Sequence, residues 1–305
     1  MASMRDIKRR KTSIQSTQQI TKAMKLVSTV KLQRAKTRAE RSKAYFNCMY
    51  DTVKRIIGRT GNTDHPYLIK GTSEKKAVVV ITSNRGLAGG YNSNIVKLVT
   101  GTDWDKKDIL VYAIGKKARD VLKRRGYSIK ADYSEVVNEP LFKDAMEISE
   151  ELLKAYEAQE IGEIWLAYTG FKNTVSHIPT LIQLLPVDVN SRADVNASNG
   201  TSELEESDLP ETVDEKKISV PMNYEPEETE ALDLIIPKYM ASLIYGALIE
   251  AVASENGARM QAMDSATSNA EEMIGTLELQ YNRARQGHIT QELTEIIGGA
   301  EALSS

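Results

Sequence analysis

The chain opens on a long stretch of helical periodicity. From about residue 3 to 57 it contains no proline, and apolar or small residues recur along one side among many basic positions. That side comprises Ile7, Ile14, Thr21, Met24, Val27 or Ser28, Leu32 and Ala35. The pattern predicts one helix about 80 Å long, which is longer than a small domain needs. We expect Gly58, Gly61, Asn62 and Pro66 to end it.

The middle of the chain changes to short β-rich runs. They cover 76–83, 108–115, 163–169 and 180–187, and helical segments at 93–100, 116–125 and 140–158 lie between them. Strands that alternate with helices predict an α/β domain whose largely parallel sheet is covered on both faces.

A polar segment and a second long helix follow. Residues 190–217 are rich in Asp, Glu, Ser, Asn and Thr, and we expect them to form an acidic, mobile loop. After Pro226 a helical stripe runs almost to Gly298, with Pro237 near its start. The stripe comprises Met240, Ile244, Ala247, Ala251, Ala258, Ala262, Ala266, Met273 and Leu277. Its many small residues allow a second helix to approach closely.

These elements predict a fold that is α/β plus all-α. The N- and C-terminal helices are expected to pair as a long antiparallel coiled coil, with a Rossmann-like α/β domain inserted between them. We expect an N-terminal helix at 1–58, an α/β domain at 75–225 that includes the acidic loop 190–217, and a C-terminal helix at 227–305.

Charge is distributed unevenly along the chain. The net charge of -2 hides a strongly basic first helix, because thirteen Lys and Arg residues face only Asp6 and Glu40 in the first forty-odd residues. Such an arm favours an anionic partner. The single cysteine, Cys48, excludes an intramolecular disulfide and fits a reducing compartment. Because no apolar run reaches about 18 residues, we expect contact with a membrane only through partners.

The candidate chemistry is sparse. The loop SNRGLAGGYN at 83–92 is either an anion-binding nest or a structural turn, and the turn is favoured because the GK[ST] ending and the GxGxxG spacing are missing. Binding of nucleic acid by the basic N-terminal segment is disfavoured because no aromatic residue occurs before Tyr45. His65, His177 and His288 are scattered, and no nucleophile elbow is present. We therefore predict no catalytic, cofactor or metal site and no nucleic-acid partner.

Three separated motifs resemble the gamma subunit family of F-type ATP synthases, of bacterial type. They are IKRRKTSIQSTQQITKAMKLVSTVKLQRA at 7–35, SNRGLAGGYN at 83–92, and SENGARMQAMDSATSNAEEMI with LQYNRARQGHITQELTEIIGGAEA at 254–302. The family commonly has Asp and Cys where this chain has Asn84 and Ala88. The segment 190–217 lies where chloroplast-type members carry a cysteine pair, but it has no cysteine, so a thiol switch is excluded. Gating of rotation and a tolerated surface insertion both remain open for it.

The resemblance implies a non-catalytic rotor shaft that transmits torque between a membrane c-ring and a ring of alpha and beta subunits. It implies contacts with beta at Met24, Arg259, Arg285, Gln286, Thr290 and Glu292, and with the c-ring and epsilon at Tyr224 and Glu225. It further implies one copy per complex, on the cytoplasmic face of the cell membrane, without cofactor or membrane insertion. The alternatives are a coiled-coil scaffold with an α/β head and a nucleotide-binding enzyme.

Overall fold

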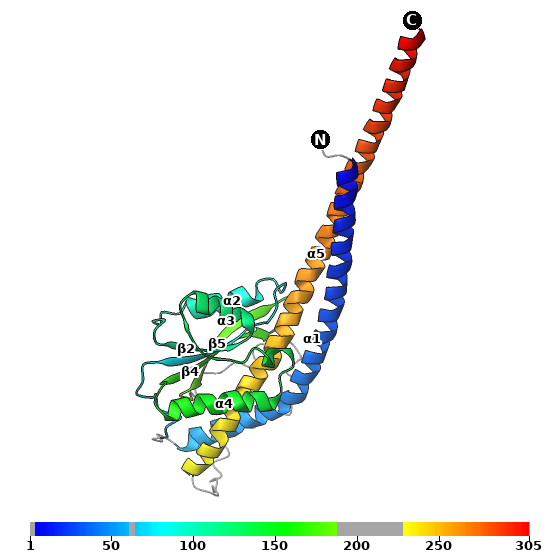
Figure 1. The fold of residues 1–305 in the computed structure, drawn as a ribbon. Helices are drawn as coiled ribbons and strands as arrows, with labels where there is room; N and C mark the ends of the chain where they lie inside the picture. Colours follow the sequence, from blue (N-terminus) through cyan, green and yellow to red (C-terminus); the bar gives the residue numbers. More distant parts are fainter. Residues whose placement is uncertain (1–3, 61–64, 188–227, 305) are drawn as a thin grey trace. The chain divides into compact units, whose positions relative to one another are not determined.

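The computed structural model describes residues 4–60, 65–187 and 228–304, which belong to two compact units. Unit 1 is formed by the segments 1–29 and 259–305, and unit 2 by 30–258. Helices α1 (Met4–Thr60) and α5 (Glu228–Ser304) contribute to both units (Figure 1). Helix α1 continues two residues past Gly58 and ends before Gly61, because a single glycine costs a helix only about 1 kcal/mol. Helix α5 runs through Gly298, within the expected range 227–305.

In unit 1, α1 and α5 pack antiparallel along a heptad seam. Positions with reduced exposure alternate at spacings of three and four residues on both helices, which is the period of a left-handed coiled coil. They are Ile7, Lys11, Ile14, Gln18, Thr21, Lys25 and Ser28 on α1, and Met263, Thr267, Ala270, Ile274, Leu277, Tyr281 and Ala284 on α5. The expected antiparallel coiled coil is confirmed.

The seam decides one open position of the expected stripe and departs from the stripe at another. Ser28 is only 2% exposed whereas Val27 is 58% exposed, so the small polar residue takes the seam position. Met273 is 44% exposed, contrary to the prediction, while Ala270 and Leu277 are buried. The seam advances every 3.5 residues and passes through Ile274, which leaves Met273 at its side.

Unit 2 is built on a five-stranded sheet in the order β3-β2-β1-β4-β5. The strands are β1 (Lys76–Ile81), β2 (Ile109–Ile114), β3 (Ser128–Asp132), β4 (Glu163–Phe171) and β5 (His177–Leu185). The first four are parallel, and β5 pairs antiparallel with β4. Strand β3 was not expected, because its sequence SIKAD carries polar residues at an exposed edge.

Helices cover both faces of this sheet. Val78 and Val80 face α2 (Tyr91–Thr100) and α3 (Lys116–Arg124), which lie on one side (Figure 1). Val79 and Ile81 face α4 (Phe142–Glu157) and the parts of α1 and α5 that belong to unit 2. A short 3-10 helix, Val136–Asn138, precedes α4. The Rossmann-like α/β prediction is confirmed, with one antiparallel edge strand.

Among the described residues, one helix, α5, is long and apolar enough to cross a membrane by length and composition alone. Its mean hydropathy reaches 1.4 over 18 residues, and 61% of that stretch is buried inside the protein. Core side chains such as Ile236, Met240, Ile244 and Leu248 are at most 1% exposed. The apolar character of α5 is therefore that of a core helix packed on the sheet.

Candidate functional site

Polar contacts join the two helices of unit 1 at regular intervals. Lys11 Nζ lies 2.7 Å from Glu278 Oε1, and Lys25 Nζ lies 2.5 Å from Asp264 Oδ1. Between them, Gln18 Nε2 donates to Glu271 Oε1 at 3.0 Å. Each acidic partner directly follows a buried seam residue of α5. Two cations of the basic first helix are thus paired within the chain rather than left for a partner.

Past the start of α1, helix α5 continues with exposed side chains. Arg285, Gln286, Thr290 and Glu292, which the resemblance implied as contacts of beta, all lie here and are exposed. Two side-chain contacts here are local: Thr290 Oγ1 donates to the Gln286 carbonyl at 2.9 Å, and His288 Nδ1 lies 3.3 Å from Glu292 Oε1. These side chains are therefore presented on one helix end without contacts to distant parts of the described chain.

The same helix end carries large apolar side chains that the sequence analysis did not single out. Ile289, Leu293, Ile296 and Ile297 are 47%, 54%, 68% and 62% exposed. They recur at spacings of three and four residues in the run ITQELTEII, which was the available signal. An exposed apolar stripe of this kind marks an interaction surface.

The other two residues that the resemblance implied as contacts of beta, Met24 and Arg259, are less exposed. Met24 and Arg259 are both half-buried in unit 1. Met24 precedes the paired Lys25, and Arg259 lies five residues before Asp264, so both lie near the last of the three polar contacts. Tyr224 and Glu225 lie outside the described residues, as does the acidic segment 190–217.

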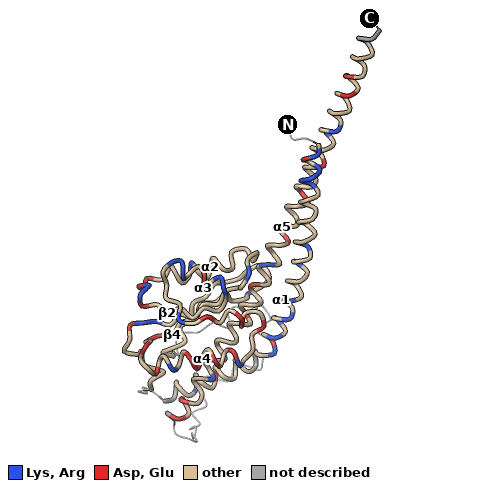
Figure 2. Tube along the Cα trace, viewed as in Figure 1, with Lys and Arg blue, Asp and Glu red and all other residues tan. Residues whose placement is uncertain are grey.

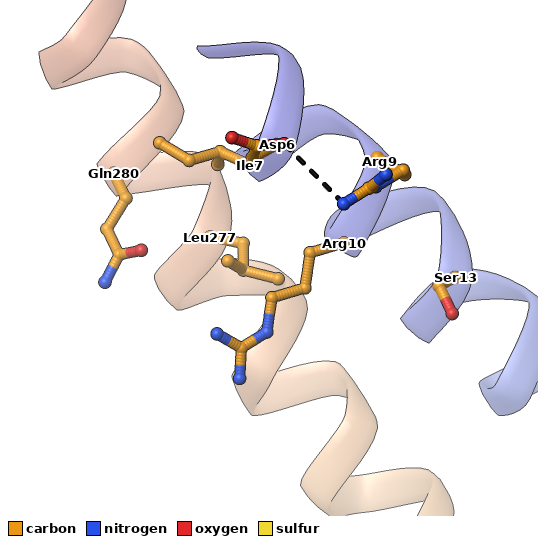
Figure 3. A pocket seen from close by; sticks show the side chains of 7 residues that line it. All are labelled: Asp6, Ile7, Arg9, Arg10, Ser13, Leu277 and Gln280. Carbon is orange, nitrogen blue, oxygen red and sulfur yellow. Dashed lines mark ion pairs between the residues drawn. The ribbon is translucent and has the colours of Figure 1, made fainter. Parts of the chain in front are cut away.

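Arg10 borders two hollows on the surface of this coil. The first, of about 510 Å³, is lined by Asp6, Ile7, Arg9, Arg10, Ser13, Leu277 and Gln280. Figure 3 shows Arg10 reaching from α1 across to α5, while Arg9 pairs with Asp6 at 3.6 Å. The second hollow shares Arg10, Leu277 and Gln280. The Arg10 stem thus borders the seam while its charge stays exposed, as long cationic side chains commonly do.

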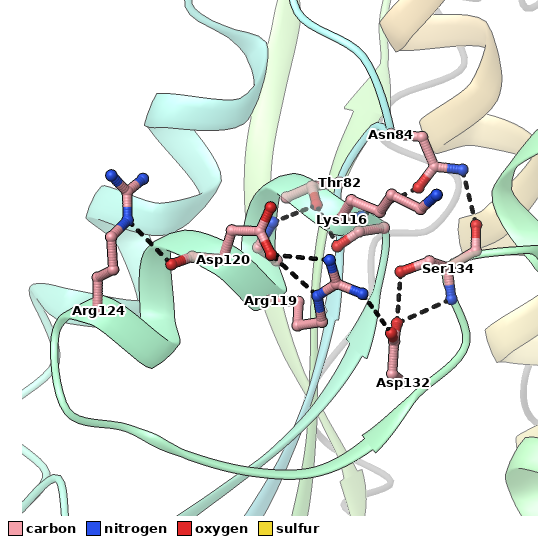
Figure 4. A network of polar contacts seen from close by, with 10 residues as sticks. Thr82, Asn84, Lys116, Arg119, Asp120, Arg124, Asp132 and Ser134 are labelled. Atoms are coloured by element: carbon pink, nitrogen blue, oxygen red, sulfur yellow. Dashed lines mark hydrogen bonds and ion pairs between the residues drawn. The ribbon is translucent and has the colours of Figure 1, made fainter.

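The glycine loop in unit 2 is held by side-chain hydrogen bonds. Asn84 Nδ2 donates to the Ser134 carbonyl at 2.7 Å, and Asn84 Oδ1 accepts from the Lys116 N–H at 3.0 Å (Figure 4). An aspartate cannot donate to that carbonyl, which explains why an amide suits this position here. Nearby, Arg119 pairs with Asp132 at 2.8 Å. The loop has the build of a structural turn.

Helix α5 occupies the place where doubly wound sheets bind ligands. That place is the crevice at the carboxyl ends of the strands on either side of the topological switch point, here β1 and β4. Tyr91, which begins α2 after β1, donates its hydroxyl to the Ala251 carbonyl at 3.2 Å. At the end of β4, the backbone of Phe171 forms a hydrogen bond with Glu250. The chain's own helix therefore contacts both borders of the crevice.

Glu250 is an unusual residue for this position. Its side chain is 6% exposed, and Oε2 has no hydrogen-bond partner among the described residues. Burial raises the pKa of the carboxyl to about 8, although the Phe171 backbone favours the ionised form. Tyr168, whose own pKa is raised by burial and by Glu250, lies nearby with an unpartnered hydroxyl. Glu250 is thus a neutral acid in the interior at neutral pH.

The histidines do not form a joint site. His65 Nε2 lies 3.2 Å from Asp233 Oδ1 in unit 2, whereas His288 belongs to the end of α5 in unit 1. Within 4–60, 65–187 and 228–304, no group of three or more His, Cys, Asp and Glu side chains has the arrangement of a metal site.

Comparison with known proteins agrees with this architecture. A family model described as ATP synthase matches residues 3–303. An ATP synthase gamma chain of Lachnoclostridium phytofermentans is 63% identical over 304 residues, which cover 100% of both chains. A sodium ion specific ATP synthase gamma chain of Acetobacterium woodii is 39% identical, with 99% of both chains covered.

Solved structures share the fold. A chain of the Euglena gracilis mitochondrial ATP synthase, in a structure of OSCP, F1 and the c-ring, superposes with a TM-score of 0.65 at 20% identity. It covers 98% of this chain and 94% of its own. A chain from the central stalk and c-ring of the Tetrahymena thermophila enzyme gives a TM-score of 0.56 at 24% identity, covering 81% and 99%.

The family match over residues 3–303, in a chain with two long terminal helices and an α/β sheet between them in the sequence, defines the class: this is a subunit of the ATP synthase family. Within that family the full-length relatives are gamma chains. The chain belongs to the ATP synthase gamma-chain family.

Proposed function

We propose that this chain is the central rotor shaft of an F-type ATP synthase. In this role it passes torque between an ion-driven membrane c-ring and a ring of three alpha and three beta subunits. The observation that carries the proposal is the two-helix coil of unit 1, whose α5 continues alone with an exposed surface in a chain of the gamma family. A single helix with exposed apolar and polar side chains suits a partner that surrounds it.

The proposed shaft acts on the beta subunits because its surface is asymmetric about its axis. Because unit 1 presents different residues on each side, it makes different contacts with three otherwise identical beta subunits. Each step of rotation then shifts those subunits among states of different nucleotide affinity, which is a population shift driven mechanically. The chain itself performs no chemical step in this account and needs no cofactor.

The residues of this chain that contact beta are assigned from their places in the sequence motifs. Arg285, Gln286, Thr290 and Glu292 are proposed to meet loops of beta near the end of α5, and their exposure supports this assignment. Met24 and Arg259 are proposed to meet the acidic levers of beta. The remaining cations of α1, visible along that helix in Figure 2, have the complementary sign and attract those levers at long range.

The contacts with the membrane ring are also assigned by resemblance. Tyr224 and Glu225 are proposed to contact the c-ring and epsilon. One copy of the chain is expected per complex, peripheral to the cell membrane on its cytoplasmic face, without nucleic acid and without membrane insertion of its own. The burial of the most apolar stretch of α5 supports attachment through partners.

A nucleotide-binding role is disfavoured by the crevice. The contacts of Ala251 and Glu250 with the borders of β1 and β4 support a site closed by the chain itself. Titration calorimetry of the chain with ATP and with NAD is expected to give no binding heat. Saturable heat with either ligand would restore the enzyme alternative.

The assembly test is direct. The chain is mixed with alpha and beta subunits, and the complexes are imaged by electron microscopy. The proposal expects one copy on the axis of each hexameric ring. A copy bound only at the outside of the ring, or no co-purification, would favour a scaffold role instead.

A further inference from the structure

The polar contacts of unit 1 follow one repeat on both helices. Lys11, Gln18 and Lys25 are spaced by one heptad along α1, and their partners Glu278, Glu271 and Asp264 are spaced by one heptad in the opposite direction along α5. We name these three contacts the register ladder. A fourth contact, between the Thr21 and Thr267 hydroxyls at 2.8 Å, lies in the seam itself.

The apolar seam beside the ladder is narrow. Of the buried α1 positions in unit 1, Thr21 and Ser28 are small and polar, and the α5 side includes Ala270. Small side chains interdigitate less deeply than Leu or Ile, so they hold two helices less firmly against sliding. Polar residues at seam positions are the usual means by which a coiled coil specifies its register. The ladder is therefore placed where the apolar seam specifies register least.

The charges of the two helices also oppose one direction of sliding of α5 along α1. If α5 shifted by one heptad so that later residues moved into the ladder positions, Lys11 would face Arg285 in place of Glu278. Like charges would then replace an ion pair at that position. A shift that is not a whole number of heptads would take at least part of the buried seam out of the interface.

We propose that the register ladder prevents α1 and α5 from sliding along each other when the coil is twisted, so that torque applied to one helix reaches the other. This inference rests on the proposed rotor function. Twisting two helices that wind around each other moves the residues of one past those of the other, and the ladder resists that motion at three levels. Lys11, Gln18 and Lys25 are thus positioning residues rather than contacts of beta.

The ladder is a determinant of register more than of stability. Exposed ion pairs contribute little to the free energy of unfolding, and the side chains of Lys25 and Asp264 are 39% and 56% exposed. Melting temperature is therefore a weak reporter of its function. Register under load is the quantity to measure.

The first experiment uses the assembled complex in vesicles and measures ions pumped per ATP hydrolysed against an opposing ion gradient. Lys25→Glu and Asp264→Lys are each expected to lose coupling under the gradient, whereas the double swap that carries both substitutions restores it. Glu272→Lys makes the same charge change on α5 next to the ladder residue Glu271 and is the matched control, expected to stay coupled. Equal coupling in both single variants and the control would overturn the proposal.

The second experiment reads register directly. In a Cys48→Ser background, the pair Thr21→Cys with Thr267→Cys reports the native register. The pair Thr21→Cys with Met260→Cys reports a shift of one heptad in the other direction, in which Lys11 would face Glu271 and residue 25 would face the uncharged Gly257 in place of Asp264. During hydrolysis against the gradient, the shifted pair is expected to cross-link only when Lys25→Glu is added. No such cross-link in that variant would overturn the proposal. Failure of the unmodified chain to rotate would instead contradict the rotor function, so the two failures are distinguishable.

Discussion

Gly257 on α5 lies directly against His177 on β5. A Cβ atom added at Gly257 would stand 2.6 Å from His177 Nε2 and 3.5 Å from the Phe171 ring. The absence of a side chain at Gly257 therefore lets α5 approach the hairpin formed by β4 and β5. The same approach brings Glu250 and Ala251 to the borders of the crevice.

Gly257→Ala should weaken this packing. The added methyl group must displace an imidazole that is itself half-buried, and overpacking of this kind costs about 1–3 kcal/mol. Chemical denaturation of the full chain measures the loss. Gly275→Ala is the matched control, since nothing lies within 4 Å of its added Cβ. It should gain up to about 1 kcal/mol as a better helix former, and equal stability of the two variants would contradict the close approach.

Glu250 should make stability fall as pH rises. Burial raises its folded pKa to about 8, against an ordinary value of 4.5, so the folded state holds a proton that the unfolded state releases in this window. The unfolding free energy therefore decreases between these two values, by at most about 1.4 kcal/mol per pH unit from this group. Glu250→Gln keeps a neutral side chain and should remove that slope. Denaturant unfolding curves measured from pH 5 to 9 test this prediction. The same pH dependence of the unfolding free energy in the unmodified chain and in Glu250→Gln would contradict it.

Glu163 should make stability rise with pH, in contrast to Glu250. It is buried, which raises the pKa, but contacts with Lys70, Lys76 and the Trp165 indole outweigh burial and hold the pKa at about 2. Its contribution is complete above the unfolded pKa near 4.5 and is lost as pH falls towards 2. Glu163→Gln leaves the half-buried Lys76 without its partner and should cost about 3 kcal/mol at neutral pH.

A surface pair provides the comparison for Glu163. Glu160 pairs with Lys130 at 3.3 Å, with both side chains about half exposed. Glu160→Gln should change the unfolding free energy by no more than about 1 kcal/mol. A cost for Glu163→Gln as small as that for Glu160→Gln would show that the buried pair contributes little.

Much of the architecture was predictable from hydrophobic periodicity. The four expected strands and both long helices are present, because buried β-branched runs and a long helical stripe are strong signals. Strand β3 was missed because SIKAD alternates polar residues at a sheet edge, where pairing with β2 rather than burial determines the conformation. Met273 was misassigned because a period of 3.6 drifts from the 3.5 of a coil.

The candidate surfaces were only partly predictable. The exposed positions at Arg285 to Glu292 came from resemblance, whereas the apolar Ile289, Leu293 and Ile296 followed from a pattern that was not used. The pairing of Lys11 and Lys25 depends on the register between helices far apart in sequence, so local sequence could not reveal it. The role of Glu250 likewise depends on where α5 crosses the end of β4.

Deleting α5 from Thr290 onwards should weaken coupling and torque. The deletion removes Thr290 and Glu292 together with the exposed apolar stripe, but leaves the register ladder intact. We expect the truncated chain to assemble with alpha and beta and to show reduced ATP synthesis per ion gradient. Full coupled synthesis by an assembled, truncated complex would remove these residues from the proposed contact surface.

The central claim is that this chain turns inside the ring. Cys48 is the single cysteine and is exposed, so it offers one attachment point for a bead or fluorophore. With the alpha and beta subunits fixed to a surface and ATP supplied, observation of that probe measures rotation directly. The account predicts continuous rotation in one direction that stops when ATP is removed. Steady ATP hydrolysis by the same complexes with a probe that only fluctuates about a fixed angle would contradict it.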